Sequence, residues 1–130
     1  MGAPQFAQQV DNTQTNNAVL TEAEITANTA NQFDDDRVSK DLSSGDYTTG
    51  ENNISGASEI SGVVTINDSN SADIKVEWTD GTGAVLATES PSDLQGISDQ
   101  ATFNFIVKST HFNLKVSGTS TDADITVNAH

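Results

Sequence analysis

The stretch Ala101–Ala129, ATFNFIVKSTHFNLKVSGTSTDADITVNA, decides the fold of this chain. In three consecutive runs, apolar side chains take every second position and polar ones take most of the places between. The apolar positions are Phe103, Phe105, Val107, Phe112, Leu114, Val116, Ala123, Ile125 and Val127. A period of two is the pattern of β-strands with one buried face. Turns at Ser109-Thr110 and at 118–121 would set Val107 opposite Phe112 and Val116 opposite Ala123. The stretch therefore predicts a three-stranded antiparallel meander.

Three earlier runs, at 60–66, 74–78 and 84–87, have the same period. The sequence Asp80-Gly81-Thr82-Gly83 predicts a β-hairpin between the last two of them. Gly62 lies inside the first run, where a glycine indicates a bulge or a close approach of two backbones.

The sequence also predicts the structure of three other segments. Leu94 and Ile97, in the connection 91–100, are predicted to cover one end of it. The segment 18–30 fits either a short helix or a seventh strand, and its β-branched, Asn-rich end favours the strand. The turn signals at 43–53 predict a loop around Tyr47.

These patterns predict an all-β protein. A chain of 130 residues fits a single domain, and about six to eight short strands favour an antiparallel β-sandwich, immunoglobulin-like or jelly-roll. We assign this domain to residues 18–130 and an extended N-terminal arm to residues 1–17. The arm has Phe6 and Val10 as its bulky apolar anchors. It is either a disordered tail or a segment that becomes ordered against a partner, with those two residues as the contacts.

Charge is the main compositional feature. The chain has 19 acidic and 5 basic residues, a formal net charge of −14, which argues against a nucleic-acid partner. At molar salt the screening length falls to about 3 Å, so repulsion between surface carboxylates largely disappears. The composition therefore resembles that of proteins from extreme halophiles. An ordinary acidic extracellular domain is the alternative.

The residues or segments that several functions require are absent from the chain or poorly placed in it. The chain has no cysteine, so it has neither disulfides nor a thiolate site. Its short apolar runs exclude a membrane-spanning helix, and we expect no secretory signal from the polar first residues. His111, in a predicted turn, and His130, at the last position, are poorly placed as general bases. We therefore expect no enzymatic activity and no organic cofactor.

Asp34, Asp35 and Asp36 form the candidate metal site. Carboxylate oxygens are the ligands of calcium and magnesium ions, so either ion could bind at such acidic segments. The alternative is a hydrated acidic surface, with Arg37 and Lys40 placed to neutralise it.

We also predict the surroundings of three other residues. Trp78 has the parity of Ile74 and Val76, which predicts a buried indole rather than a sugar-stacking platform. Lys108 and Lys115 belong to the small set of basic residues. We expect both to contact carboxylates, within the sheet or across a subunit contact.

The segments Glu77–Leu86, EWTDGTGAVL, and Phe112–Gly118, FNLKVSG, together with the polar arm and the Ser/Thr/Asn-rich composition, resemble the minor virion proteins of tailed viruses. These are capsid decoration, turret or tail-associated β-sandwiches, and the acidity is similar to that of viruses of halophilic archaea. The resemblance implies a trimer or pentamer that contacts the major capsid protein or another virion protein. It also implies assembly in the host cytoplasm and exposure of the virion to high-salt medium. The alternative function is a tail-associated or surface module that binds a receptor or glycan.

Overall fold

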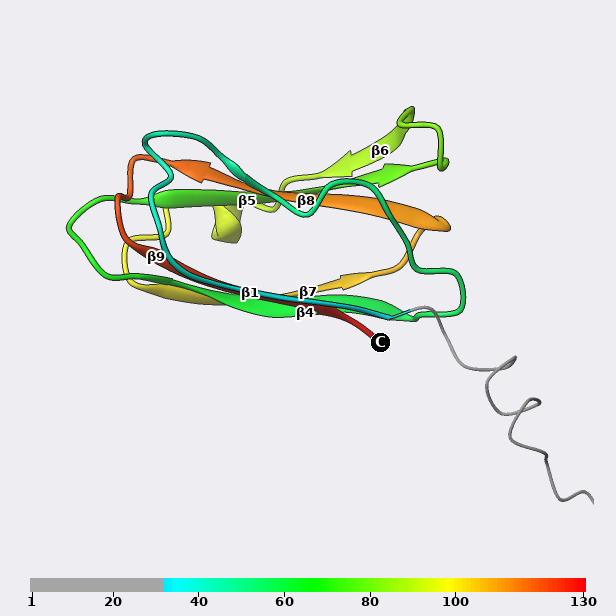
Figure 1. Cartoon of the computed structure of the whole chain (residues 1–130), viewed down its shortest axis with the longest axis horizontal. Coiled ribbons are helices and arrows are strands. Elements are labelled where there is room, and N and C mark those ends of the chain that lie inside the picture. Colours follow the sequence, from blue (N-terminus) through cyan, green and yellow to red (C-terminus); the bar gives the residue numbers. More distant parts are fainter. Residues whose placement is uncertain (1–31) are drawn as a thin grey trace, which may run out of the picture.

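The computed structural model describes residues 32–130, which form an antiparallel β-sandwich (Figure 1). The predicted fold class is confirmed. The strands are β1 (Phe33–Lys40), β2 (Tyr47–Thr48), β3 (Asn52–Asn53), β4 (Glu59–Ile66), β5 (Ala72–Thr79), β6 (Val85–Glu89), β7 (Gln100–Ile106), β8 (His111–Gly118) and β9 (Ala123–Ala129), with a short 3₁₀ turn, η2 (Ser92–Leu94). No helix in these residues is long and apolar enough to cross a membrane.

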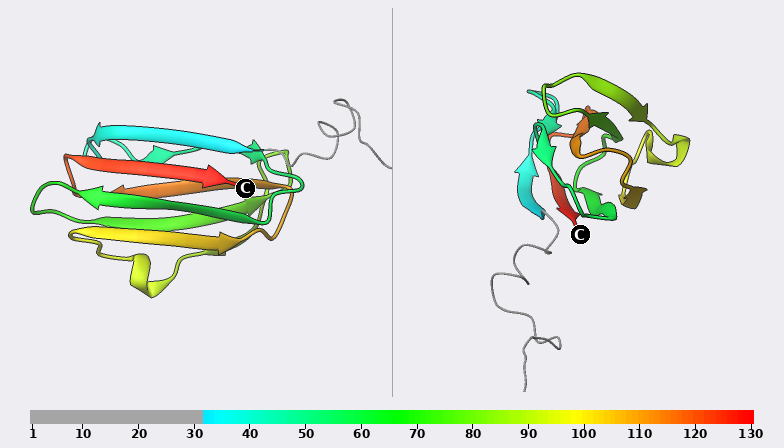
Figure 2. Two further views of the ribbon diagram at one scale, coloured as in Figure 1. Left: turned by 90° about the horizontal axis from the view of Figure 1, so that it is seen from below. Right: turned by 90° about the vertical axis from the view of Figure 1, so that its right-hand side faces the viewer.

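Two sheets make up the sandwich. Sheet A has the strand order β1-β9-β4-β7, and sheet B has the order β2-β8-β5-β6 with β3 also paired to β8 (Figures 1 and 2). If β2 and β3 are taken as one interrupted strand, each sheet has four strands. Every connection then crosses between the sheets except the β5–β6 hairpin. Of the two architectures expected, this is the jelly roll.

The predicted meander at 101–129 is wrong. β7 pairs with β4 in sheet A, β8 pairs with β5 in sheet B, and β9 returns to sheet A between β1 and β4. Each run still turns its apolar face to the core. The period of two fixes which face is buried but not which strand lies alongside, and the segments 107–110 and 119–122 span the distance between two packed sheets as easily as they would close a hairpin.

Of the other local predictions, one is confirmed, others missed strands, and some concern residues outside the described part of the chain. The hairpin at Asp80–Gly83 is confirmed, with Thr79 paired to Val85 and an irregularity in register beside Trp78. Strand β1 was not predicted, and the expected loop at 43–53 contains the two short strands β2 and β3. The arm anchors Phe6 and Val10, and the segment 18–30, lie outside the described residues.

The core lies between the sheets and includes residues from the inner faces of both. Leu94 and Ile97 are buried as expected, and Ile97 also exchanges backbone hydrogen bonds with Ala72 at the margin of sheet B. Phe33 at the start of β1 packs edge-on against Phe112 of β8, with the ring centroids 5.4 Å apart. This contact between β1 and β8 joins the two sheets at one end of the core.

Gly62 marks a close approach of backbones, one of the two expected possibilities. It pairs with Val127 and Phe103 in an uninterrupted register. A Cβ atom at this position would lie 1.9 Å from the carbonyl oxygen of Thr126 and 2.7 Å from the Phe103 ring. The Phe103 ring covers the glycine, a known way of supporting glycine in a sheet.

Candidate interaction surface

Uncharged side chains fill most of the outer face formed by β9, β4 and β7 in sheet A. The pairing of β9, β4 and β7 sets Asn128, Ser61 and Asn104 in one row and Thr126, Val63 and Thr102 in the next. Thr65 and Gln100 follow in the third row, where Gln100 donates a hydrogen bond to Thr65. We call these eight residues the uncharged face.

Acidic residues lie around this face rather than on it. Asp124 lies at one end, in the row of Thr65, and Glu59 lies at the other, where its carboxylate accepts a hydrogen bond from Asn104. Asp34 and Asp36 of β1 flank it, because β1 is the strand next to β9. Carboxylates therefore bound the uncharged face along β1 and at both ends, but not along the edge formed by β7.

The three candidate metal ligands lie on strand β1 and do not converge. Successive strand residues point to opposite faces, so Asp34 and Asp36 are exposed, whereas Asp35 is partly buried. The Asp35 carboxylate accepts a 2.6 Å hydrogen bond from the Tyr47 hydroxyl and lies 3.6 Å from the Arg37 guanidinium. Within residues 32–130, no group of three or more His, Cys, Asp or Glu side chains is placed to hold a metal ion. Calcium or magnesium binding here stays a prediction.

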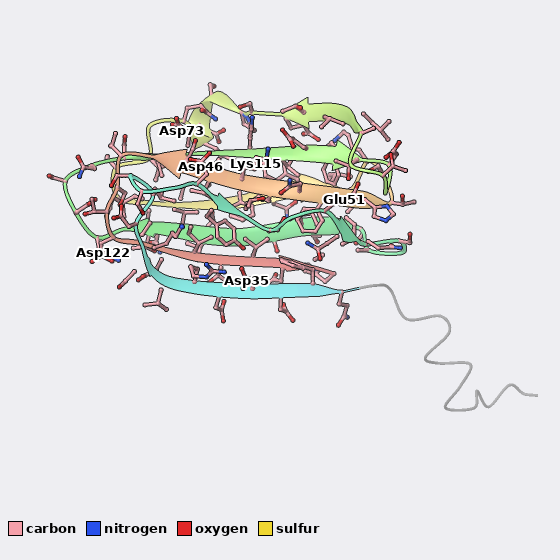
Figure 3. The ribbon with its side chains drawn as sticks, turned by 45° about the horizontal axis from the view of Figure 1, so that its top comes forward. Asp35, Asp46, Glu51, Asp73, Lys115 and Asp122 are labelled. Atoms are coloured by element: carbon pink, nitrogen blue, oxygen red, sulfur yellow. The ribbon has the colours of Figure 1, made fainter. Side chains whose placement is uncertain are left out.

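Tyr47 links the two sheets through this contact. Tyr47 is 2% exposed, and its hydroxyl reaches from β2 in sheet B to Asp35, which Figure 3 labels on β1 of sheet A. Burial is the main cause that raises the pKa of Tyr47 well above its usual range, and the hydrogen bond to Asp35 adds to it. The phenol is therefore protonated at neutral pH and serves as a donor.

Asp68 organises the end of the sandwich where β4 leads into β5. Its carboxylate accepts hydrogen bonds from the backbone N–H and the hydroxyl of Thr121, at 2.7 and 2.9 Å, and from the hydroxyl of Ser120. The Thr121 N–H is the largest cause of the lowered pKa of Asp68. Asp73, near the start of β5, accepts a hydrogen bond from the N–H of Gly96. The two carboxylates thus hold separate loops.

The lysine expectation is confirmed within the chain. Lys115 lies on the outer face of sheet B (Figure 3). It lies 3.3 Å from Glu77, which Lys75 also approaches at 3.7 Å. Lys108, just after β7, lies 3.1 Å from Glu89 of β6. This last pair joins the two sheets at their β6–β7 side.

The two histidines and the tryptophan have structural surroundings. Trp78 is fully buried, as predicted. The His111 ring contacts the Thr110 hydroxyl at 2.8 Å and lies against Gly81 of the hairpin. The His130 ring contacts the Ser61 hydroxyl at 3.1 Å. Sequence reasoning did not find the uncharged face, because its residues come from three strands whose neighbours only the fold defines.

Comparisons with known proteins identify no family for this chain. No family model matches the sequence, and no curated protein matches it. Among solved structures, one similar chain comes from work titled "Bacillus endospore appendages form a novel family of disulfide-linked pili". It is 13% identical, the match covers 78% of this chain and 83% of that one, and the TM-score is 0.42.

Proposed function

We propose that the protein is a non-enzymatic structural subunit of a virion. In this proposal it decorates or stabilises the capsid through contacts with other copies of itself and with the major capsid protein or another virion protein. The observation that carries the proposal is the uncharged face of sheet A in a chain whose net charge is −14. The particle would be exposed to a salt-rich medium.

The uncharged face is suited to being covered. Covering a carboxylate without a cation beside it carries a large desolvation cost, whereas hydroxyl and amide groups need only new hydrogen-bond partners. The face consists of Ser, Thr, Asn and Gln side chains around Val63, so a protein partner can replace its water at little electrostatic cost. The exposed carboxylates of Asp34 and Asp36, beside it, suit the surface that stays in contact with solvent.

The fold and the aromatic residues also help to choose between the structural role and the alternative, a receptor- or glycan-binding module. Jelly rolls occur in viral capsid domains and in lectins, so the fold by itself supports either reading. Binding of a glycan usually needs exposed aromatic rings. In residues 32–130, however, Tyr47, Trp78, Phe103, Phe105 and Phe112 are buried, and Phe33 is half-buried against the core. We therefore favour the structural role over a receptor- or glycan-binding module.

The direct test is co-sedimentation with virus particles. Particles from the culture that produces the protein would be separated in a density gradient at molar salt and their proteins identified by mass spectrometry. We expect the protein in the particle fraction, and its release when the salt is lowered. Recovery only in the soluble fraction would contradict the proposal.

Salt dependence of the isolated protein tests the environment. At molar salt we expect a folded, self-associated protein, and in dilute buffer a less stable one, because repulsion among carboxylates is then unscreened. Sedimentation gives the mass and Trp78 fluorescence reports the fold. A chain that stays folded and monomeric at every salt concentration would argue against salt adaptation and self-association together. Deletion of residues 1–16 should leave the sandwich folded but abolish binding to the capsid, because the proposal assigns the arm to contacts with another virion protein.

A further inference from the structure

We propose that the free edge of β7 pairs with β7 of a second copy, antiparallel about a two-fold axis, so that sheet A continues from one copy into the other. The proposal rests on the structural role above and names the contact between copies. It follows from a comparison of the edge strands in the described part of the chain.

Sheet edges expose unpaired N–H and C=O groups, and proteins usually protect them with charges, bulges, prolines or very short strands. β1 carries Asp34 and Asp36 and has an irregular register between Arg37 and Lys40. β2 and β3 have only two residues each. β6 is short, and its pairing with β5 is irregular beside Trp78.

β7 has none of these protections. Its sequence, QATFNFI, contains no charge and no proline, and it pairs with β4 in an uninterrupted register from Gln100 to Ile106. The side chain of Ile106, at its end, is 64% exposed. The strand lies at the margin of sheet A in Figure 2.

The backbone groups that point away from β4 can be identified. Ile66 N–H bonds to the carbonyl of Asp99, and Val107 N–H bonds to that of Ser58. Because alternate residues of a strand bond to the same side, the odd-numbered residues of β7 face β4. The outward residues are Gln100, Thr102, Asn104 and Ile106, all with exposed side chains, and no hydrogen bond involves their N–H or C=O groups within residues 32–130.

Charge selects a second β7 as the partner strand. On β1, the same reasoning places the outward backbone groups at Asp34 and Asp36, because Glu59 and His130 bond to each other and alternate residues of β9 then face β1. Two copies that meet at β1 would therefore bring carboxylates together. Two copies that meet at β7 bring together Thr, Asn, Gln and Ile side chains. At molar salt the remaining repulsion between the acidic bodies is screened beyond about 3 Å.

The geometry also gives a register. A two-fold axis at Phe103 uses the whole strand and places Thr102 opposite Asn104 of the partner subunit, both with outward backbone groups. The inner face then matches as well, because Ala101 comes opposite Phe105 of the partner subunit. The contact makes a dimer, in place of the trimer or pentamer that the resemblance implies.

Cysteine trapping in the full chain tests the pairing and its register. The protein has no cysteine, so Thr102→Cys and Asn104→Cys each introduce a single thiol. Opposed residues have the Cα separation that a disulfide needs, whereas residues two positions out of register are too far apart. Under mild oxidation at molar salt, a mixture of the two variants should form several-fold more covalent dimer than either variant alone. A mixture that forms no more than the single variants overturns the proposal.

A proline substitution gives an independent measure. Thr102→Pro removes an outward N–H and leaves the bonds to β4 in place, so its sedimentation mass should fall to that of a monomer while Trp78 fluorescence stays native. Asp36→Pro is the matched control, since it removes an outward N–H at the opposite edge of the same row; it should associate like the wild type. A folded Thr102→Pro variant with wild-type mass overturns the proposal. If the wild type associates but trapping fails, the edge contact is wrong and the structural role stands; absence from virus particles refutes the structural role itself.

Discussion

The indole N–H of Trp78 donates a 2.6 Å hydrogen bond to the carboxylate of Glu89, although the tryptophan is fully buried and Glu89 lies at the end of an edge strand. The same carboxylate oxygen lies 3.1 Å from Lys108. Glu89 thus satisfies the one polar atom of a core side chain and joins it to a cation just after β7. The contact gives the core tryptophan a fixed orientation.

Substitution of Glu89 tests this contact. Glu89→Ala leaves the buried indole N–H without an acceptor, so we expect a loss of about 1–3 kcal/mol in the free energy of unfolding. Glu89→Gln keeps an acceptor and should cost less. Denaturation in guanidinium, followed by fluorescence of the single tryptophan, measures both. Lys108→Gln serves as the control, with an expected change below about 1 kcal/mol because exposed ion pairs contribute little; an equal loss in all three variants would show that the ion pair, not the indole contact, matters.

The raised pKa of Tyr47 predicts that the folded protein loses stability at alkaline pH. Because its pKa is raised in the folded state, the contribution of the phenol is present below the ordinary tyrosine pKa of about 10 and is lost as the pH rises above that value. Tyr47→Phe removes the hydrogen bond to Asp35 and should cost about 1.5 kcal/mol at neutral pH. The difference between the two proteins should shrink between pH 9 and 12, approximately the region of tyrosine ionisation. A constant difference over this range would contradict the assigned cause.

The lowered pKa of Asp68 predicts that the folded protein loses stability at acidic pH. Its pKa is lowered in the folded state, so its contribution is present above the ordinary aspartate pKa of about 4 and is lost as the pH falls further. Asp68→Asn should lower the thermal midpoint at neutral pH and should flatten the dependence of that midpoint on pH below about 4. Asp93→Asn, at an exposed position of η2, is the control and should behave like the wild type. Identical acid profiles for the wild type and Asp68→Asn would refute the role.

Gly62 predicts a steric effect on sheet A. A methyl group there meets the backbone carbonyl of Thr126 and the Phe103 ring, so Gly62→Ala should destabilise the fold by about 3 kcal/mol. Gly45→Ala is the matched control, because no atom lies within 4 Å of the added carbon. Chemical denaturation of both variants gives the comparison. Equal stability would mean that β9 can shift away from β4 without cost.

The sequence predicted the strands better than their neighbours. Phe103, Phe112 and Ile125 alternate with polar residues, and each lies in the core as that pattern requires. The pattern contains no information on pairing, so it did not show that β7, β8 and β9 alternate between the sheets. Strand β1 was missed because Asp34, Asp35 and Asp36 interrupt the apolar alternation of an edge strand that is mostly exposed.

What the sequence determined by itself is the class of fold, the buried face of each strong strand and the acidic character of the surface. These follow from local periodicity and composition, and the buried Trp78 and the paired Lys108 and Lys115 are consistent with them. The tertiary structure decided the jelly-roll pairing, the contact of Tyr47 with Asp35, and the collection of Ser61, Thr126 and Thr102 into one uncharged face. It also left β7 as an edge without protection. The physical reason is that pairing and surface patches depend on residues far apart in the chain, which only the closed core brings into fixed register.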